Sequence, residues 1–362
     1  MRLLPVFLTV GCAGLAMLLN VGCASGPGAN KTSAPGVEKT PPGEWLFAYF
    51  RQRYDSRVEV DAAGHTHNIP LPNPMRVEQL HFALSTDGRH WTPLNDNQPV
   101  WSHRLRDPYV QRGADGWWHL VATGGQRSRE AGTNAGPVCL YARSQDLVHW
   151  EEVRSLALMS GVRDATGRPA RNIWAPEWYY DRQTGDTVVL WSSSFEEAGW
   201  QRSRLWYART RDWETFTPAQ VLFAPPYSVI DGTLLEHDGT YFLFHKEEEF
   251  GAATGERRGI RLATAQKLEG PYQVFNGPLN GGQIAPTITE GPEVMPDPIQ
   301  SGWLLVYDFC MADGFGISTS PDLYHWTVDP AVSFPPDARH GCVTHLTAAE
   351  AARLRRLFSG KE

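Results

Sequence analysis

Short stretches in which apolar and polar residues alternate recur along most of the chain. In each, a strand-like run ends in a small or hydroxylated residue, a polar turn carrying Asp or Gly follows, and an aromatic residue opens the next run. The five copies are LHFALSTDGRHWTPL (80–94), CLYARSQDLVHWEEV (139–153), LWYARTRDWETFTPA (205–219), IRLATAQKLEGPYQV (260–274) and FGISTSPDLYHWTVD (315–329). The aromatic residues are Trp91, Trp150, Phe216, Tyr272 and Trp326, so one period spans roughly 54 to 66 residues. This recurrence predicts one structural unit per period.

Further strand-like runs lie between these copies: WWHLVAT (117–123), TVVLWSS (187–193), TYFLFHK (240–246) and GWLLVYD (302–308). Turns such as Ala-Asp-Gly precede them, and Gly or Asp tolerates the positive φ that a tight reversal needs. Four strands in each of five periods predict an all-β fold, a five-bladed β-propeller. Two β-sandwiches are the weaker alternative, because they would not explain a repeat that runs unbroken through the middle of the chain.

The two ends of the chain are expected to complete one blade together. The first copy of the repeat supplies outer strands, and WLFAYFR (45–51) adds one more. A blade shared between the N- and C-terminal strands would close the ring and hide its sheet edges. After the propeller, residues 347–362 predict a short helix and tail, with Thr347 as N-cap and Glu350 at the third helical position.

Two polar stretches are interpreted as loops. HTHNIPLPNP (65–74) is rich in Pro, which favours an irregular excursion over the ring, and its two His residues are not expected to bind a metal. The run Lys246-Glu247-Glu248-Glu249 is interpreted as a solvated loop, with a place on the rim of the substrate site as the alternative.

The N-terminus predicts export. Arg2 precedes an apolar run from Leu3 to Val21 that ends in small residues before Cys23, the layout of a secretory signal. It resembles a bacterial lipoprotein signal, in which the cysteine is lipidated, although Asn20 stands where Leu is usual. We therefore expect a signal peptide (1–22), a flexible tether (23–43) after a lipidated Cys23, a catalytic propeller (44–346) and a membrane-anchored protein of the periplasm or cell surface; simple secretion is the alternative.

Composition narrows the possible partners. The net charge of -7 argues against a nucleic-acid binder, which usually has a basic surface. The chain contains 14 Trp, 12 Tyr and 15 Phe, side chains with the rigid, partly polar surfaces that sugar rings contact. Cys139, Cys310 and Cys342 are widely spaced, which does not indicate a disulfide framework or a zinc site. We expect a monomer.

Charged residues beside Pro or Gly mark the start of each blade's innermost strand. These segments are RDPYV (106–110), WAPEW (174–178), IDGTL (230–234), TEGPEV (289–294) and RHGCV (339–343). Inner strands of a propeller surround a central channel, so the five segments should meet there. Glu290 and Glu293 compete for one position, and strand alternation would turn Glu293 elsewhere.

The order of these motifs resembles glycoside hydrolase family 43, five-bladed propellers that cleave arabinosyl, xylosyl or galactosyl linkages with inversion. The resemblance covers nearly all of residues 44–346. It implies that Asp107 is the general base, Glu290 the general acid, and Asp231 the residue that positions the acid and tunes its pKa. It also suggests that Trp174 and Arg339 contact substrate, that Glu177 either binds sugar hydroxyls or braces the channel, and that His340 could bind a channel metal such as Ca²⁺. No cofactor is required for hydrolysis.

Three carboxyl groups suit this chemistry for a physical reason. Inverting hydrolysis needs a carboxylate that deprotonates water and a carboxylic acid that protonates the leaving oxygen, about 6.5 to 9.5 Å apart. A neighbouring anion keeps the acid protonated by raising its pKa, and Asp231 is expected to be that neighbour of Glu290.

The sequence thus predicts a glycosidase acting on a plant-type polysaccharide or oligosaccharide, with α-L-arabinofuranosidase first and β-xylosidase or exo-galactosidase next. Anhydro-sugar or fructosyl linkages are further options within this fold. The alternative from another class is a surface glycan-binding propeller without catalysis, against which the presence of all three acids argues.

Overall fold

The computed structural model describes residues 43–61, 65–124, 137–195, 202–249, 256–310, 312 and 314–359. The predicted signal peptide, the tether up to residue 42 and Cys23 lie outside these residues. In the described part of the chain, no helix is long and apolar enough to cross a membrane.

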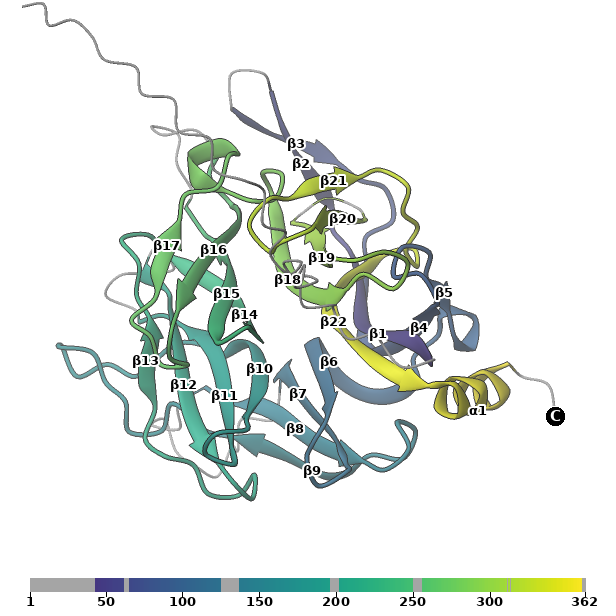
Figure 1. Ribbon diagram of the computed structural model, residues 1–362, viewed down its shortest axis with the longest axis horizontal. Coiled ribbons are helices and arrows are strands. Elements are labelled where there is room, and N and C mark those ends of the chain that lie inside the picture. The colour runs from purple at the N-terminus through teal and green to yellow at the C-terminus, as the bar shows by residue number, and fades with distance from the viewer. Residues whose placement is uncertain are drawn as a thin grey trace, which may run out of the picture. The chain divides into compact units, whose positions relative to one another are not determined.

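Three antiparallel sheets of four strands follow one another along the chain (Figure 1). Blade 2 consists of β10 (Trp174–Asp181), β11 (Asp186–Ser193), β12 (Arg204–Thr210) and β13 (Gln220–Phe223). Blade 3 consists of β14 (Val229–His237), β15 (Thr240–Glu247), β16 (Gly259–Ala265) and β17 (Gln273–Phe275). Blade 4 consists of β18 (Thr289–Pro296), β19 (Trp303–Phe309), β20 (Phe315–Ser320) and β21 (Thr327–Asp329).

An eight-stranded sheet contains the other two blades. Blade 1 consists of β6 (Trp101–Arg112), β7 (Trp118–Gly124), β8 (Cys139–Ser144) and β9 (Glu151–Leu156). Blade 5 consists of β22 (Ala338–Thr347), β1 (Gly43–Arg53), β4 (Met75–Ser85) and β5 (Thr92–Pro93). A short pairing of β4 with β6 joins them. β22 pairs with β1 from Gly43↔Thr347 to Arg51↔Ala338, which confirms that the two ends of the chain share one blade.

The innermost strands β6, β10, β14, β18 and β22 form a closed ring. Each contacts the next, and β22 contacts β6. Apolar side chains of neighbouring blades fill the space between sheets; Val188 and Leu205 of blade 2, for example, belong to one buried cluster with Leu243 and Ala263 of blade 3. The predicted five-bladed β-propeller is confirmed, and the sandwich alternative is not.

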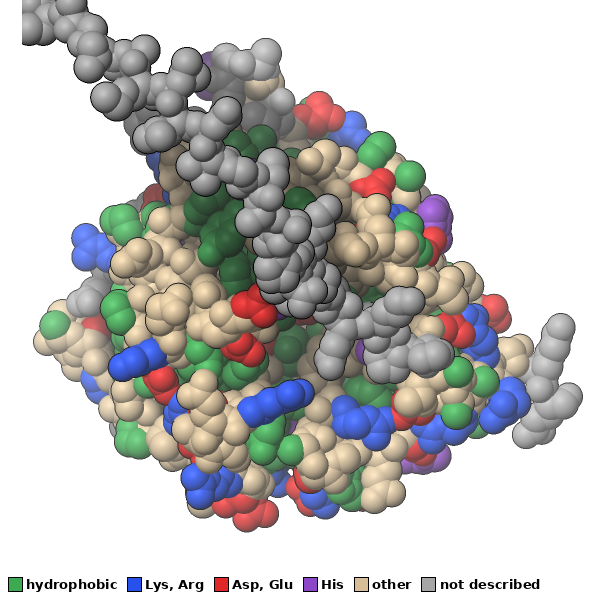
Figure 2. Space-filling model, in the orientation of Figure 1, with side chains coloured by type: hydrophobic (Ala, Val, Ile, Leu, Met, Phe, Trp, Pro, Cys, Tyr) green, Lys and Arg blue, Asp and Glu red, His purple; other side chains and the backbone are tan. Residues whose placement is uncertain are grey.

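Acidic and basic side chains are interspersed over the face that Figure 2 shows.

The repeat found in the sequence forms the turn between the third and fourth strands of a blade. In blade 1, Ser144 Oγ accepts the backbone N–H of Leu147 at 2.9 Å, and the Asp146 carboxylate accepts those of Val148 and His149. Leu147 has a φ of 64°, the left-handed conformation that this turn requires. The hydroxyl and the Asp of the repeat therefore close the turn.

The corresponding turns begin at Ser85, Thr210 and Ser320. Blade 3 departs from them, because Lys267 stands where the other copies have Asp. There the N–H of Gly270 donates to the carbonyl of Lys267 at 3.0 Å instead. Backbone bonding thus replaces the side-chain contacts where the repeat is weakest.

Helix α1 (Ala348–Phe358) begins as predicted, since Thr347 accepts from the N–H of Glu350 and the Glu350 side chain accepts from the backbone of Thr347. Two short 3₁₀ turns, η1 (Asn95–Asn97) and η3 (Asn280–Gly282), lie in connections. The predicted irregular loop at 65–74 is wrong in part. β3 (Thr66–Pro70) pairs with β2 (Ser56–Val60) as a hairpin, because the prolines lie at or beyond the end of the paired segment and leave its N–H groups free to bond.

Candidate active site

The inner strands are interrupted at the predicted motifs. The pairing register slips between Arg106 and Tyr109, Trp174 and Glu177, Ile230 and Thr233, and Glu290 and Glu293. At these slips Asp107 and Asp231 have φ values of 47° and 50°, which residues other than Gly rarely adopt. Such bulges turn a side chain away from the regular pleat, and residues held in this region cost about 1–3 kcal/mol each. The motifs are therefore strained points at which the strand redirects its side chains.

Asp107, Asp231 and Glu290 line one pocket of about 280 Å³. They come from β6, β14 and β18 and are 183 residues apart at most in sequence (290 − 107 = 183). The structure thus brings the three predicted acids together. The other lining residues are Tyr54, Arg106, Thr123, Trp174, Ile230, Lys246, Glu248, Arg258, Cys310 and His340.

Asp107 and Asp231 share His340 as a neighbour. His340 Nδ1 lies 3.7 Å from Asp107 Oδ1 and 3.9 Å from Asp231 Oδ2. Asp231 Oδ2 also accepts the N–H of Gly291 at 3.2 Å. Burial raises the pKa of Asp231 to about 6, although the His340 charge opposes the rise. Burial lowers the pKa of His340, but the charges of Asp231 and Asp107 outweigh it and leave that pKa above its ordinary value.

Glu290 lies between two cations. Lys246 Nζ donates to Glu290 Oε2 at 2.8 Å, and Arg339 Nη2 donates to Oε1 at 3.3 Å. Burial alone would raise the pKa of Glu290, but the charges of Lys246 and Arg339 outweigh it and hold that pKa well below its usual range. The expectation that Asp231 keeps Glu290 protonated is not met in this arrangement, because two close cations act more strongly than one neighbouring anion.

Lys246 and Glu248 line the pocket, which fits the alternative interpretation of the run Lys246–Glu249 as part of the rim of the site. The run Lys246–Glu249 was expected to be a solvated loop, but the Lys246 side chain is 1% exposed and also binds Glu248 Oε2 at 2.7 Å. The Glu247 carboxylate points the other way, to Arg257 and Arg261. Strand β15 continues through Lys246 and is buried from Tyr241 to Glu247, so no alternation of exposed and buried positions marks Lys246 as a pocket residue.

Arg339 acts on the pocket through Glu290. It is 2% exposed and is not among the lining residues, which corrects the expectation that it contacts substrate. Its guanidinium binds the carbonyl oxygens of Phe309 and Ala312, and Asp308 Oδ1 at 3.3 Å, and it packs over the Tyr54 ring. Burial raises the pKa of Asp308 to about 7. Arg339 is therefore a positioning residue.

Glu177 and Glu293 lie outside the pocket lining. Glu177 is 4% exposed and accepts the Thr233 hydroxyl at 2.6 Å, so the structure favours a bracing role over sugar contact. Burial raises the pKa of Glu293 to about 8 and that of Glu177 well above its ordinary value. Of the two competing glutamates, the structure places Glu290 on the pocket. Trp174 lies on it as expected.

The described residues contain no group of three His, Cys, Asp or Glu side chains that could hold a metal ion in the channel. Ca²⁺ takes six to eight oxygen ligands, and His340 offers a ring nitrogen beside two carboxylates. The residues described here do not fit such a site. His340 is instead explained by its contacts with Asp107 and Asp231.

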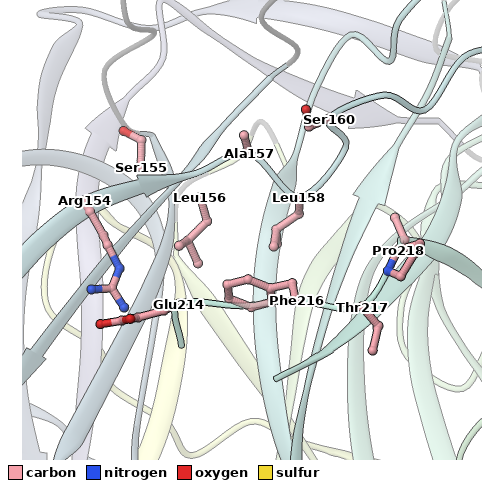
Figure 3. A pocket seen from close by; sticks show the side chains of 11 residues that line it. Arg154, Ser155, Leu156, Ala157, Leu158, Ser160, Glu214, Phe216, Thr217 and Pro218 are labelled. Atoms are coloured by element: carbon pink, nitrogen blue, oxygen red, sulfur yellow. The ribbon is translucent and has the colours of Figure 1, made fainter. Parts of the chain in front are cut away.

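A second cavity, of about 670 Å³, lies near the outer edge of blades 1 and 2 (Figure 3). It is lined by β9 and by the segment 214–219, and Figure 3 shows the Phe216 ring near Leu156 and Leu158. Glu214 is the acidic residue of its lining. One carboxyl cannot supply both an acid and a base, so the smaller axial pocket is the better candidate for catalysis.

The fold and the pocket define a five-bladed propeller with acidic side chains on its axis. A model of a family described as a probable glycosyl hydrolase domain, related to glycoside hydrolase family 43, matches residues 72–352. The chain belongs to this family.

The chain is also similar to proteins of known name. An α-L-arabinofuranosidase of Bifidobacterium longum subsp. longum is 29% identical over 170 residues, which are 41% of this chain and 16% of that relative. The match therefore spans a small part of that longer protein. A thermostable family-43 glycoside hydrolase aligns with a TM-score of 0.52 at 12% identity, over 84% of this chain and 99% of its own. An α-L-arabinofuranosidase from Lactobacillus brevis aligns with a TM-score of 0.45 at 17% identity, over 62% and 72%.

Proposed function

We propose that this chain is a glycosidase that hydrolyses its substrate with inversion, with Asp107 as general base, Glu290 as general acid and Asp231 as the residue that tunes the acid. The observation that carries the proposal is the meeting of these three carboxyls, from three blades, in one pocket. Asp107 and Glu290 come from different blades, and inversion requires their carboxyl groups to be about 6.5 to 9.5 Å apart so that the attacking water fits between them.

The acid must gain a proton before it can act. Glu290 is ionised by its two cations, so protonation requires that one of them be drawn away. Lys246 contacts Glu248 Oε2 at 2.7 Å and Glu290 at 2.8 Å together, so it keeps a carboxylate partner when it moves away from Glu290. A sugar that displaces water from the pocket also strengthens the burial effect, which raises the pKa of a carboxyl. We infer that substrate entry and the Lys246–Glu248 pair together shift Glu290 towards its acid form.

Asp231 suits the tuning role because it contacts the segment that carries the acid. Its carboxylate accepts the N–H of Gly291, the residue after Glu290. It thereby fixes the backbone beside the acid, and its pKa of about 6 allows its own charge to vary near neutral pH. When Asp231 is ionised, its charge favours a proton on Glu290.

The proposed substrate is a pentosyl or galactosyl unit at the end of a plant-type polysaccharide, with α-L-arabinofuranoside first. The pocket volume of about 280 Å³ lies just below the range of about 300–1,000 Å³ for small-molecule sites, which suits one sugar unit better than a chain. The name of the Bifidobacterium relative supports arabinose. β-Xylosides and galactosides are the next candidates.

Hydrolysis of a panel of aryl glycosides, arabinan, xylan and arabinogalactan by the wild-type chain tests this function. Release of free arabinose is expected, and proton NMR of the first product should show inverted anomeric configuration. Retention would overturn the inverting assignment. If the wild type cleaves nothing while it and Asp107→Asn bind the same glycans, the protein is a glycan-binding propeller instead.

We also propose that the chain is exported and anchored through Cys23. Expression in a bacterial host with a radioactive fatty acid should label the wild type and not Cys23→Ala. Equal labelling of both chains would overturn the lipidation.

A further inference from the structure

A groove of about 670 Å³ adjoins the axial pocket. The two share Arg106, Thr123 and Trp174 as lining residues, so they are continuous. The groove extends from there over Arg76 and Glu78 of β4 and over residues 102–106 of β6. A glycan with one unit in the pocket would place a neighbouring unit here.

The groove is basic although the chain as a whole is acidic. Three arginines, Arg76, Arg104 and Arg106, and one carboxylate, Glu78, line it. Arg104 binds Glu78 Oε2 through Nε at 2.8 Å and through Nη2 at 2.5 Å, which neutralises that carboxylate. Arg76 and Arg106 then remain without an ion-pair partner among the described residues, although the carboxylates of Asp107 and Glu290 in the adjoining pocket act on Arg106 from a distance. Composition does not explain this concentration of charge.

Arg106 has donors available at the junction of groove and pocket. Its guanidinium packs against the Phe50 ring at 5.0 Å, and among the described residues it forms no hydrogen bond or ion pair. Its Nε is buried without an acceptor. A buried donor left unpaired costs about 1–3 kcal/mol, so an oxygen ligand that reached it would be bound favourably. Arginine forks match the two oxygens of a carboxylate or sulfate.

Trp174 supplies the other half of a sugar site. It lines both cavities beside Arg106. An aromatic ring packs against the apolar face of a sugar, whereas the guanidinium groups select for charge. The combination recognises a sugar ring that carries an oxyanion.

We propose that the groove binds an anionic sugar, so that the natural substrate is an acidic glycan whose unit next to the cleaved one bears a carboxylate or a sulfate. The proposal rests on the proposed function for the position of the cleaved unit. Arg106 and Arg76 hold the oxyanion, and Trp174 packs on the ring. The shared chemistry is a sugar-borne oxyanion, and its two sources are a uronic acid and a sulfate ester.

Calorimetric titration of the full chain carrying Asp107→Asn, which should bind without cleaving, tests the groove. The probes are trigalacturonic acid, the carboxyl-reduced form of the same trisaccharide, and a sulfated galactan oligosaccharide of matched length. We expect at least one anionic probe to bind tenfold or more tightly than the neutral trisaccharide. Salt should weaken that preference, because screening reduces exposed charge interactions. The tighter anionic probe identifies the source of the oxyanion.

Charge variants of the Asp107→Asn chain test whether the preference for anionic probes comes from the groove. Arg106→Gln and Arg76→Gln should each lower the ratio of anionic to neutral affinity severalfold. Arg211→Gln is the matched control, because it removes the same charge from an exposed side chain paired with Asp186 in blade 2. It should leave the ratio unchanged. An equal loss in all three variants would indicate a general charge effect and overturn the groove.

The experiments give one set of results if this inference is wrong and another set if the proposed function is wrong. If the wild type hydrolyses neutral glycosides and the Asp107→Asn chain binds neutral and anionic probes equally, the function stands and the anionic groove is wrong. If anionic probes bind with an Arg106-dependent preference but the wild type cleaves no glycoside, the groove stands and the proposed function is wrong.

Discussion

On the two sides of the axial pocket, the pKa values of the buried carboxyls Asp231 and Glu290 are shifted in opposite directions. On the histidine side, defined as Asp107, Asp231 and His340, the closest contacts between charged groups are 3.7 and 3.9 Å long. On the cation side, defined as Glu290 with Lys246 and Arg339, Lys246 approaches to 2.8 Å. The pKa of Asp231 is raised to about 6, whereas that of Glu290 is held below its usual range.

This difference shows that burial does not by itself determine which carboxyl holds a proton. Burial is the largest effect on both Asp231 and Glu290 and raises both pKa values. The sign of the result depends on the nearest partner: for Asp231 a histidine 3.9 Å away, for Glu290 a lysine and an arginine that both donate to its carboxylate. The proposed division of labour between base, tuner and acid therefore depends on side chains outside the three acids.

The largest expected effect comes from removing one proposed acid or base from each side. Glu290→Gln keeps the size of the side chain and should lower kcat/KM on an arabinan by about 10²- to 10⁴-fold, the usual contribution of proton transfer. On a 2,4-dinitrophenyl glycoside the loss should be far smaller, because that leaving group needs little protonation. Asp107→Asn should impair both substrates alike, since both need an activated water.

Steady-state kinetics on the two substrates check this contrast. Circular dichroism of both variants provides the control for folding. Equal losses in Glu290→Gln on the activated and natural substrates would remove Glu290 from the role of acid.

Most of the fold could be predicted from the sequence because its signals are local. A hydroxyl, an Asp and an aromatic residue at fixed spacing mark the turn in four copies of the repeat, and the weaker fifth copy, in blade 3, completes the count of five blades. The hairpin β2–β3 was missed for a related reason: the prolines near Thr66–Pro70 suggested irregular structure, whereas they lie where the pairing ends.

The site was harder to predict because its charges come from different blades. Asp107, Asp231 and Glu290 could be found through motifs at strand entrances. The contact of Lys246 with Glu290 joins residues of blades 3 and 4, and no local pattern specifies it. The sequence did not decide between sugar contact and bracing for Glu177, or place Arg339 outside the pocket, for the same reason: a strand bulge decides whether a side chain enters the pocket, and sequence alternation does not reveal where the register slips.

The next effect isolates the cation side. Lys246→Met removes one of the two charges that hold Glu290 ionised, so the pKa of Glu290 should rise by about 1–3 units. The acid must be protonated to act, and activity falls as pH rises through its pKa. The alkaline limb of the kcat/KM profile should therefore move to higher pH.

A pH profile of kcat/KM from pH 3 to 9 measures this shift. Lys246→Arg restores a cation and should return the limb towards its wild-type position, which separates charge from packing. A melting curve is needed beside it, because removing one member of a buried ion pair destabilises a protein by about 3–5 kcal/mol. A limb that stays in place, or moves to lower pH, would show that Lys246 does not control the acid.

The smallest effect concerns the buried acids outside the pocket lining and appears in stability. The folded pKa of Glu293 is raised to about 8, above its ordinary value of 4.5, so the folded chain keeps a proton that the unfolded chain releases. The stabilisation from this group is complete below about pH 4.5 and is lost as pH rises towards 8, with a slope of up to about 1.4 kcal/mol per pH unit for one proton. Glu293→Gln cannot lose a proton, so its free energy of unfolding should fall less between pH 5 and pH 8 than that of the wild type.

Urea unfolding at both pH values measures the difference, with Glu214→Gln, an exposed carboxyl, as the matched control. If Glu293→Gln and the wild type lose stability in parallel, Glu293 is ionised in the folded chain. Burial would then not raise the pKa of a carboxyl outside the pocket lining, and the contrast between Asp231 and Glu290 would be confined to the pocket.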